Sequence, residues 1–344
     1  MALSAIQPPP ASGPGTAAPQ RSYRRLIISV LFVLVAFSLL PGVSASTGDR
    51  LPDFISCTAQ CDALNCDEGS SYVPIYLRLL FWTCSQNCDY TCQRLVTADR
   101  IMMGESVEQF HGKWPFLRIA GVQEPLSVLF SILNFVPHYH GFRALLSSLR
   151  APNAPTTLLW VYLGIAITGM NAWTWSSVFH TRDFVVTECL DYFSAGLTVL
   201  YGFYAASVRV FRLDYPRRRY TRYTLAFVCI VLYILHVLYL SLVRFNYGYN
   251  MLANVFVGLL QNVLWVSFSL FQYWKFREYW RLWPLGLVIT VSLAMSFELF
   301  DFPPILDMLD AHALWHAGTV LPTYWWYNWM NRDIQALKTS KVKN

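Results

Sequence analysis

The chain has 344 residues, of which 55% are hydrophobic and 13% are charged. Soluble globular proteins have about 25% charged residues, so this composition excludes an ordinary soluble domain and indicates a multi-span membrane protein. Aromatic residues reach 16%, which is typical of proteins whose Trp and Tyr side chains lie at two membrane interfaces. The net charge of +6 does not indicate nucleic-acid binding, because the basic residues cluster in loops between apolar stretches.

Residues 1–45 are predicted to be a secretory signal with a polar N-terminal extension. The extension is rich in Pro, Ala, Ser and Gly and ends in Arg24 and Arg25, and residues 26–40 are apolar or small. The small residues Val43-Ser44-Ala45 are suited to cleavage. We expect cleavage after Ala45, and the alternative is an uncleaved anchor. Both place residue 46 onward in the lumen.

Residues 46–118 are predicted to form a small cysteine-rich lumenal domain. Six cysteines lie there within 36 residues: Cys57, Cys61, Cys66, Cys84, Cys88 and Cys92. An even set of cysteines in a secreted chain is typical of a disulfide framework, which a domain of about 70 residues needs for stability. Spacings of four residues suit two short helices joined by disulfides. Zinc binding is the less favoured alternative, and about fifteen disulfide pairings are open.

Seven apolar stretches follow, each near the roughly 20 residues that a helix needs to cross the hydrocarbon core. They lie near 121–138, 156–178, 184–206, 223–243, 250–272, 280–300 and 307–329. We therefore predict an all-α membrane protein with a seven-helix membrane domain over 119–330 and a basic cytosolic tail over 331–344. On the predicted cytosolic side lie 15 Lys and Arg residues, against Arg182 and Arg244 in the lumenal loops, which supports this orientation.

Two histidines in the last apolar stretch are the first candidates for a functional site. His312 and His316 are four residues apart and share one face of a helix. Imidazoles inside a membrane are costly without a task or a partner, and such a pair is typical of transition-metal ligands. The alternative is hydrogen bonding to backbone or carboxylate groups. In the predicted topology both histidines lie in the lumenal half, at the depth of His180 and Asp191 from two other helices.

Three histidines with an open position are typical of catalytic zinc, which lowers the pKa of bound water to about 7. We expect His180, His312 and His316 to bind Zn²⁺. Asp191 is then placed to take the proton of the zinc-bound water, although pairing with Arg182 is an alternative.

Two further residues are expected near the zinc. Ser176 lies four residues before His180, on the same helical face, and its hydroxyl is expected to donate to a developing oxyanion. We do not favour it as nucleophile, because the histidines are committed to metal. Back-bonding to its own helix is the alternative role. Glu124, at the start of the first span, is expected to be an interfacial acid or to support the site from its lumenal rim.

The site positions resemble a known superfamily. Ser176, His180, Asp191 and the pair His312 and His316 are similar to the motif of the alkaline ceramidase and adiponectin/progestin receptor superfamily. Three other stretches resemble the Per-like family of post-GPI-attachment phospholipases: QFHGKWPF at 109–116, QEPLSVLFS at 123–131 and WSSVFHTRD at 175–183. With the six-cysteine region, this resemblance covers about residues 48 to 330.

The resemblance implies a seven-helix fold with zinc held by the three histidines. It also implies a phospholipase A2-type hydrolase, in which a zinc-bound hydroxide removes the sn-2 acyl chain from the phosphatidylinositol of GPI-anchored proteins. GPI-anchored proteins and membrane phospholipid would be its substrates, in the endoplasmic reticulum membrane or, alternatively, the Golgi membrane. Two other functions stay open: a heptahelical receptor or scaffold with a structural metal, and a hydrolase of another lipid such as ceramide. The cysteine-rich region argues against the first and the Per-like stretches against the second.

Overall fold

The computed structural model describes residues 46–66 and 73–342, and the predicted signal at 1–45 lies outside them. Over these ranges the chain is all-helical, without a β-strand. The cysteine-rich region contains η1 (Gly48–Arg50), α2 (Pro52–Asn65), α3 (Ile75–Leu79) and α4 (Cys84–Met102). The helices that follow are α5 (Pro125–Ser148), α6 (Thr156–Thr181), α7 (Val185–Val210), η2 (Pro216–Arg218), α8 (Arg219–Leu238), η3 (Tyr239–Val243), α9 (Tyr247–Phe276), η4 (Tyr279–Leu282), α10 (Trp283–Met295), η5 (Ser296–Leu299) and α11 (Ala311–Val342).

Helices α2 and α4 form a hairpin that three disulfides hold together. The bonds are nested, in the order Cys57–Cys92, Cys61–Cys88 and Cys66–Cys84. Nested pairing brings two helices together antiparallel, and spacings near four keep the sulfurs of each helix on one face. The predicted disulfide framework is therefore confirmed, and these six thiols are not a zinc site. We call α2 and α4 the disulfide hairpin.

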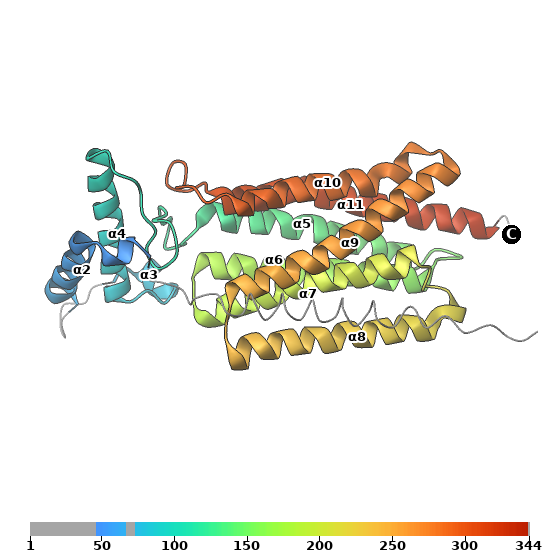
Figure 1. Cartoon of the computed structure of the whole chain (residues 1–344), viewed down its shortest axis with the longest axis horizontal. Helices are drawn as coiled ribbons and strands as arrows, with labels where there is room; N and C mark the ends of the chain where they lie inside the picture. The colour runs from blue at the N-terminus through green and yellow to red at the C-terminus, as the bar shows by residue number, and fades with distance from the viewer. Residues whose placement is uncertain (1–45, 67–72, 343–344) are drawn as a thin grey trace, which may run out of the picture. The chain divides into compact units, whose positions relative to one another are not determined.

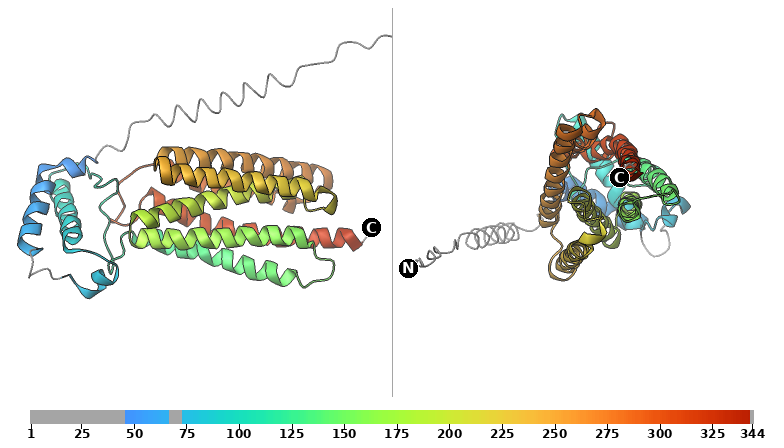
Figure 2. Two further views of the ribbon diagram at one scale, coloured as in Figure 1. Left: turned by 90° about the horizontal axis from the view of Figure 1, so that it is seen from below. Right: turned by 90° about the vertical axis from the view of Figure 1, so that its right-hand side faces the viewer.

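Helices α5 to α11 run side by side, as Figures 1 and 2 show. Helix α5 packs against α6 and α11, α6 packs against α7, and α7 packs against α8 and α9. Helix α10 packs between α9 and α11. Their common core includes fully buried aromatic side chains from three of these helices, Tyr162, Trp265 and Trp329. This packing brings the end of α6 next to the start of α11, where the candidate histidines lie.

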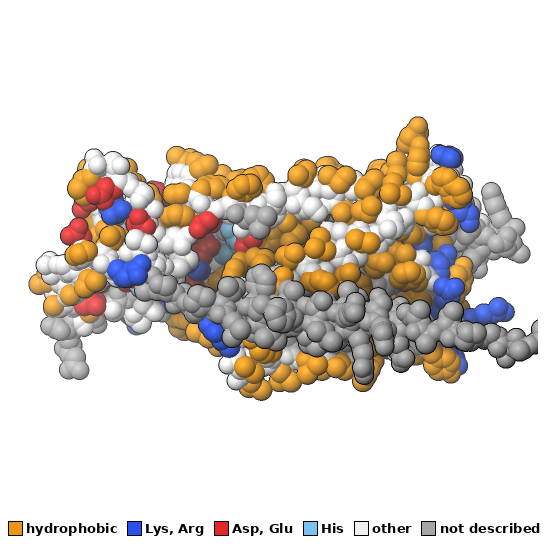
Figure 3. Space-filling view, in the orientation of Figure 1, with side chains coloured by type: hydrophobic (Ala, Val, Ile, Leu, Met, Phe, Trp, Pro, Cys, Tyr) orange, Lys and Arg blue, Asp and Glu red, His pale blue; other side chains and the backbone are white. Residues whose placement is uncertain are grey.

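Three stretches of the described chain are long and apolar enough to cross a membrane: Pro216–Val243, Tyr247–Phe276 and Tyr279–Glu298. Helices α5, α6, α7 and α11 have 24, 26, 26 and 32 residues, and all four carry buried polar side chains. Hydrophobic side chains cover much of the helical surface in Figure 3, and Lys and Arg gather at the end where α11 finishes. The chain is a membrane protein, and seven crossings remain a prediction.

Helix α11 differs from the predicted last span at both ends. It begins at Ala311 rather than near residue 307, because the Asp310 carboxylate accepts a hydrogen bond from the backbone N–H of Ala313 at 2.9 Å and caps the helix. It continues to Val342, through the predicted tail. There Asp333 binds Arg209 of α7 through two hydrogen bonds of 2.6 and 2.7 Å. Arg209, one of the 15 basic residues counted on the predicted cytosolic side, is thus a buried residue of an ion pair between helices.

Candidate metal centre

The three predicted histidines meet at one point between α6 and α11. His180 lies in the last turn of α6, and His312 and His316 lie in the first turns of α11. One ligating nitrogen from each lies within 4.8 Å of the other two, and the Nε2 atoms of His180 and His312 are 3.3 Å apart. In a tetrahedral site with Zn–N bonds of about 2.0–2.1 Å, neighbouring ligand nitrogens are about 3.3–3.4 Å apart. The spacing of His180 and His312 therefore fits a zinc ion.

The other ring nitrogen of each histidine is engaged outside this point. The Nδ1 atoms meet Glu124 Oε2 at 2.7 Å from His180, Glu298 Oε2 at 2.8 Å from His312, and Ser131 Oγ at 3.1 Å from His316. A proton on Nδ1 leaves a lone pair on Nε2, which is the tautomer that binds a metal through Nε2. The chemistry of this donor set thus fits a divalent metal, with two carboxylates and a hydroxyl orienting the ligands.

The hydrogen bonds of Ser131 determine the tautomer of His316. The Ser131 hydroxyl donates its one proton to the Ser127 carbonyl at 2.7 Å. Its other partners must then donate to it: His316 Nδ1, and the Ser176 hydroxyl at 2.9 Å. His316 Nδ1 also lies 3.4 Å from the Ser127 carbonyl, which can only accept. Ser176, expected as an oxyanion donor, therefore directs its proton to Ser131 and belongs to the network that orients His316.

Asp191 lies on α7, half-buried, and interacts electrostatically with His180 and His312. Among the described residues, none forms a hydrogen bond or an ion pair with its carboxylate. The alternative partner, Arg182, instead donates to the Gln86 side chain and the Asp183 carbonyl, both at 2.9 Å. The pairing of Asp191 with Arg182 is therefore wrong, and within the described part of the chain the Asp191 carboxylate has no hydrogen-bond partner.

Glu124 lies where the loop from the disulfide hairpin enters α5, and it is buried. One carboxylate oxygen holds His180, and the other accepts from Lys113 Nζ at 2.7 Å. Lys113 Nζ also lies 2.9 Å from Asp183. Burial by itself would lower the pKa of Lys113, but the attraction of Glu124 and Asp183 raises it above its usual range. Lys113 therefore stays charged and neutralises Glu124.

Three residues of this arrangement were not expected from the sequence. Glu298 had a usable signal, because it is an acid within the predicted span 280–300, and acids inside membranes are usually functional. Ser131 is one of two serines in its span, and Lys113 is one basic residue of a loop. Both lie in stretches that resemble the Per-like family, 123–131 and 109–116, but nothing within those stretches indicated a role for either residue.

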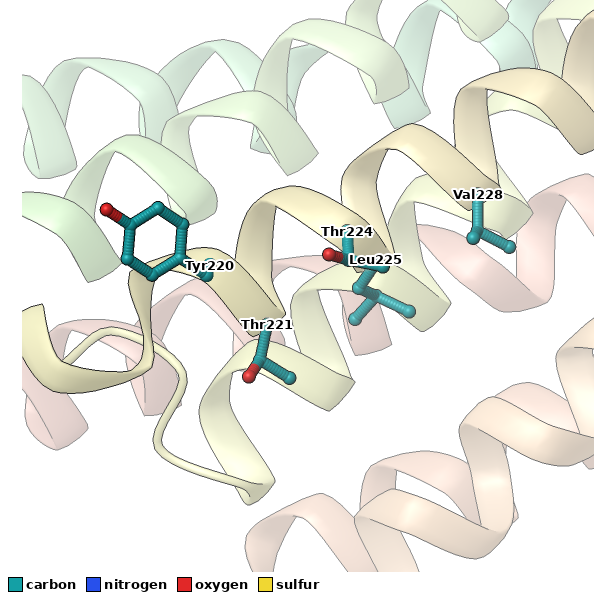
Figure 4. Close-up of a pocket in the computed structure, with 5 residues that line it drawn as sticks. All are labelled: Tyr220, Thr221, Thr224, Leu225 and Val228. Atoms are coloured by element: carbon teal, nitrogen blue, oxygen red, sulfur yellow. The ribbon is translucent and has the colours of Figure 1, made fainter.

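Other histidines remain outside the centre. His138 is buried in α5 and bonds to the Tyr327 hydroxyl at 2.7 Å. His236 in α8 bonds to Tyr249 and Asn250, as expected for a packed side chain. A hollow of about 490 Å³ on α8 is also separate: Figure 4 shows that its lining side chains all come from one helix, and none of them is a histidine or an acid. It offers no groups for metal chemistry.

Comparison with known sequences finds one family and several related proteins. The family described as the Per1-like family matches residues 74–334. The chain is 42% identical over 313 residues to "Protein PER1 homolog" of Schizosaccharomyces pombe, covering 88% of this chain and 92% of that protein. It is 38% identical over 352 residues to "Protein PER1" of Saccharomyces cerevisiae, covering 89% and 97%. It is also 37% identical over 312 residues to the human "GPI-specific phospholipase A2-like PGAP3", covering 87% and 93%. No solved structure matches the chain.

Proposed function

The chain belongs to the Per1-like family, and from this we propose that it is a hydrolase of GPI-anchor remodelling. We propose that it removes the sn-2 acyl chain from the phosphatidylinositol of GPI-anchored proteins. The observation that carries the proposal is the convergence of three histidines whose Nδ1 atoms are all engaged. The printed name of the human relative, a phospholipase A2-like protein specific for GPI, points to the same reaction.

In this proposal His180, His312 and His316 hold a zinc ion. When bound, zinc polarises an ester carbonyl and lowers the pKa of a water molecule. Glu124, Glu298 and Ser131 keep the imidazoles in the ligating tautomer and orientation.

The reaction proposed is ester hydrolysis. Asp191 accepts a proton from the attacking water, whose oxygen bonds to the carbonyl carbon of the sn-2 ester. The bond between that carbon and the glycerol oxygen breaks, and the proton passes to the glycerol oxygen. The products are a free fatty acid and a lysolipid. Ser176 assists an oxyanion only if its hydroxyl turns away from Ser131, so its contribution is proposed to be secondary to that of Asp191.

The proposed membrane arrangement fits such a substrate. We propose seven crossings by α5 to α11, with the disulfide hairpin in the lumen and the end of α11 in the cytosol. The histidines then lie near the lumenal interface, at the level where the ester bonds of a phospholipid lie. The acyl chains would remain among apolar helices, and the glycan and protein of the substrate would remain outside the membrane. The endoplasmic reticulum, or alternatively the Golgi, is the proposed compartment.

The test is the sn-2 chain of GPI anchors in cells that carry only the wild-type chain or only His316→Ala. We expect the wild type to produce the lyso form and the variant to keep the original acyl chain. His236→Ala is the control, because this histidine lies in α8 and, in the described part of the chain, its ring bonds to Tyr249 and Asn250. Identical anchors with wild type and His316→Ala would overturn the proposal. Ceramide, tested with the same membranes, should not be hydrolysed.

A further inference from the structure

A cavity of about 390 Å³ lies between α4 and the loops that precede α5 and α7. Its lining is polar and aromatic, and includes Trp82, Tyr90, Gln86, Gln123, Arg118 and Arg182. Lys113 and Asp183 also line it, and Lys113 binds the Glu124 carboxylate that holds His180. The cavity therefore adjoins the candidate metal centre on the side of the disulfide hairpin.

Two arginines enclose one indole ring in this cavity. The guanidinium carbons of Arg118 and Arg182 lie 3.6 and 3.7 Å from the ring centroid of Trp82. Two guanidinium groups cannot occupy one face of a ring at such distances, so the indole separates them. Arg118 also lies 3.9 Å from the ring of Tyr90. The aromatic rings hold the two cations in fixed positions without neutralising them.

Neither arginine has an ion-pair partner among the described residues. The carboxylates that line the cavity are already paired: Asp89 lies 3.0 Å from His111, and Asp183 lies 2.9 Å from Lys113. Both Arg118 and Arg182 have a buried Nε atom without a hydrogen-bond partner, and Arg182 is 8% exposed. Cations and N–H groups left unsatisfied in a partly desolvated site are costly to the folded state, so an anionic ligand is the simplest reason for them.

Burial disfavours the charged form of both side chains. It lowers the pKa of Arg118 to about 10, and it also lowers the pKa of Arg182. Both remain protonated at neutral pH, and an anion would recover the electrostatic energy that desolvation costs.

We propose that this cavity binds the phosphodiester of the substrate lipid, with its inositol ring, and that Arg118 and Arg182 are the residues that contact the phosphate. This inference rests on the proposed function and deepens it by placing the headgroup. Guanidinium groups bind phosphate oxygens through paired N–H donors, and the amide NH2 groups of Gln86 and Gln123 can donate to ring hydroxyls. In a phospholipid the phosphate and the sn-2 ester are separated only by glycerol carbons. Arg182 lies two residues after His180. One lipid molecule would therefore place its phosphate at Arg182 and its sn-2 ester at the histidines.

The experiment measures headgroup binding, which does not depend on turnover. The full chain in nanodiscs is titrated with glycerophosphoinositol, and separately with inorganic phosphate and glycerophosphocholine. Arg118→Gln should weaken glycerophosphoinositol binding about tenfold or more. Arg118→Lys should weaken it less, because lysine keeps the positive charge. Arg78→Gln is the matched control, because this arginine is exposed in α3 and does not line the cavity. Equal thermal unfolding of the variants would show that they fold.

Two outcomes would overturn the inference. One is unchanged glycerophosphoinositol binding in folded Arg118→Gln. The other is equal binding of inorganic phosphate or glycerophosphocholine, which would mean that no inositol is recognised. His316→Ala separates this test from the proposed reaction. It should keep wild-type headgroup affinity even if hydrolysis of GPI lipids is never detected.

Discussion

At the scale of single residues, the candidate centre depends on the partners of the histidines as much as on the histidines. A neutral imidazole with a free tautomer presents a lone pair on either nitrogen, and a hydrogen bond to one nitrogen selects the other. Glu298 does this for His312, and Ser131 does it for His316. The two kinds of partner lead to separate predictions. A carboxylate affects both the charge and the orientation of the imidazole, whereas a hydroxyl affects its orientation alone.

Glu298→Gln should lower zinc affinity about 10–100-fold, because the amide keeps the shape of the side chain but loses the charge that makes His312 a better ligand. Competition with a zinc chelator on the purified chain measures this. Glu278→Gln is the control, since Glu278 is an exposed acid whose carboxylate binds Arg281 and Trp280, away from the histidines. Equal zinc affinity in Glu298→Gln and Glu278→Gln would contradict the metal assignment.

The two serines should differ in what they lose. Ser131→Ala removes the direct partner of His316 Nδ1 and should lower zinc affinity. Ser176→Ala leaves Ser131 in place, so zinc affinity should stay close to wild type. Any loss of kcat in Ser176→Ala at full zinc loading then measures its assistance to the oxyanion, with an upper range of about 10²–10³-fold. If zinc affinity fell equally in both variants, Ser176 would be a residue that orients His316 and not one that contacts the reacting ester.

At the scale of elements, close helix contacts fix where the site residues lie. Helix α5 carries Ser131 and α11 carries His316, so the distance between these helices sets their hydrogen bond. The helices approach at Gly141, where an added Cβ would lie 2.1 Å from the ring of Tyr327. Small residues let helices of membrane proteins approach in this way.

Gly141→Ala should therefore destabilise the protein by about 1–3 kcal/mol, because the methyl group and the Tyr327 ring cannot occupy the same space. The thermal unfolding midpoint in detergent measures the change. Gly286→Ala in α10 is the matched control: its added Cβ would have no neighbour within 4 Å, and alanine favours a helix over glycine by about 1 kcal/mol. Equal midpoints for the two variants would show that α5 and α11 are not held this closely.

A second prediction at this scale concerns pH. His111 links α4 to the segment before α2, through Asp89 at 3.0 Å and Asp49 at 3.4 Å. The hydrogen bond to Asp89, with the charges of both acids, raises the pKa of His111 above 6.5 despite burial. A raised folded pKa contributes stability that is complete below the pKa of the unfolded chain and is lost as pH rises through the folded value.

The disulfide hairpin should thus resist proteolysis better at pH 6 than at pH 8. His111→Gln should remove this difference, because glutamine keeps a hydrogen bond but does not titrate. The effect is expected to be small, since the His111 side chain is 59% exposed and solvent screens its ion pairs. A pH difference of equal size in His111→Gln would assign it to another group.

At the scale of the whole molecule, the disulfide hairpin and the loop before α11 are joined. Arg94 of α4 forms an ion pair with Asp307 at 2.6 Å, and Asp301 accepts from Trp114 at 2.8 Å and also from Gln109. The loop leads directly into the turn that carries His312, so the hairpin helps to position the start of α11.

The proposed orientation makes a prediction for the two ends of one candidate span, Pro216–Val243. In a chain without Cys189 and Cys229, Arg217→Cys should react with an impermeant maleimide in sealed microsomes. Arg244→Cys should react only after detergent is added. Both positions are exposed, so access depends on the side of the membrane. The reason is the excess of basic residues on the cytosolic side. Labelling of both, or the reverse pattern, would contradict the orientation.

The sequence by itself determined what depends on neighbours along the chain. Hydrophobic stretches predicted long apolar helices, cysteine spacing predicted a disulfide-linked helix pair, and the spacing of His312 and His316 placed both on one helical face. The motif around Ser176 and His180 led to the Per-like family, to which the chain belongs. These features can be predicted from the sequence because a helical turn or a motif is complete within a few residues.

Only the tertiary structure decided which distant groups meet. It selected one disulfide pairing and buried Arg209 against Asp333, 124 residues away. It also gave His180 its carboxylate, 56 residues away, and His316 its hydroxyl, 185 residues away. The physical reason is that hydrogen bonds and ion pairs act over about 3–4 Å in space, whereas periodicity describes only neighbours along the chain. Which partners come that close is set by how the helices pack.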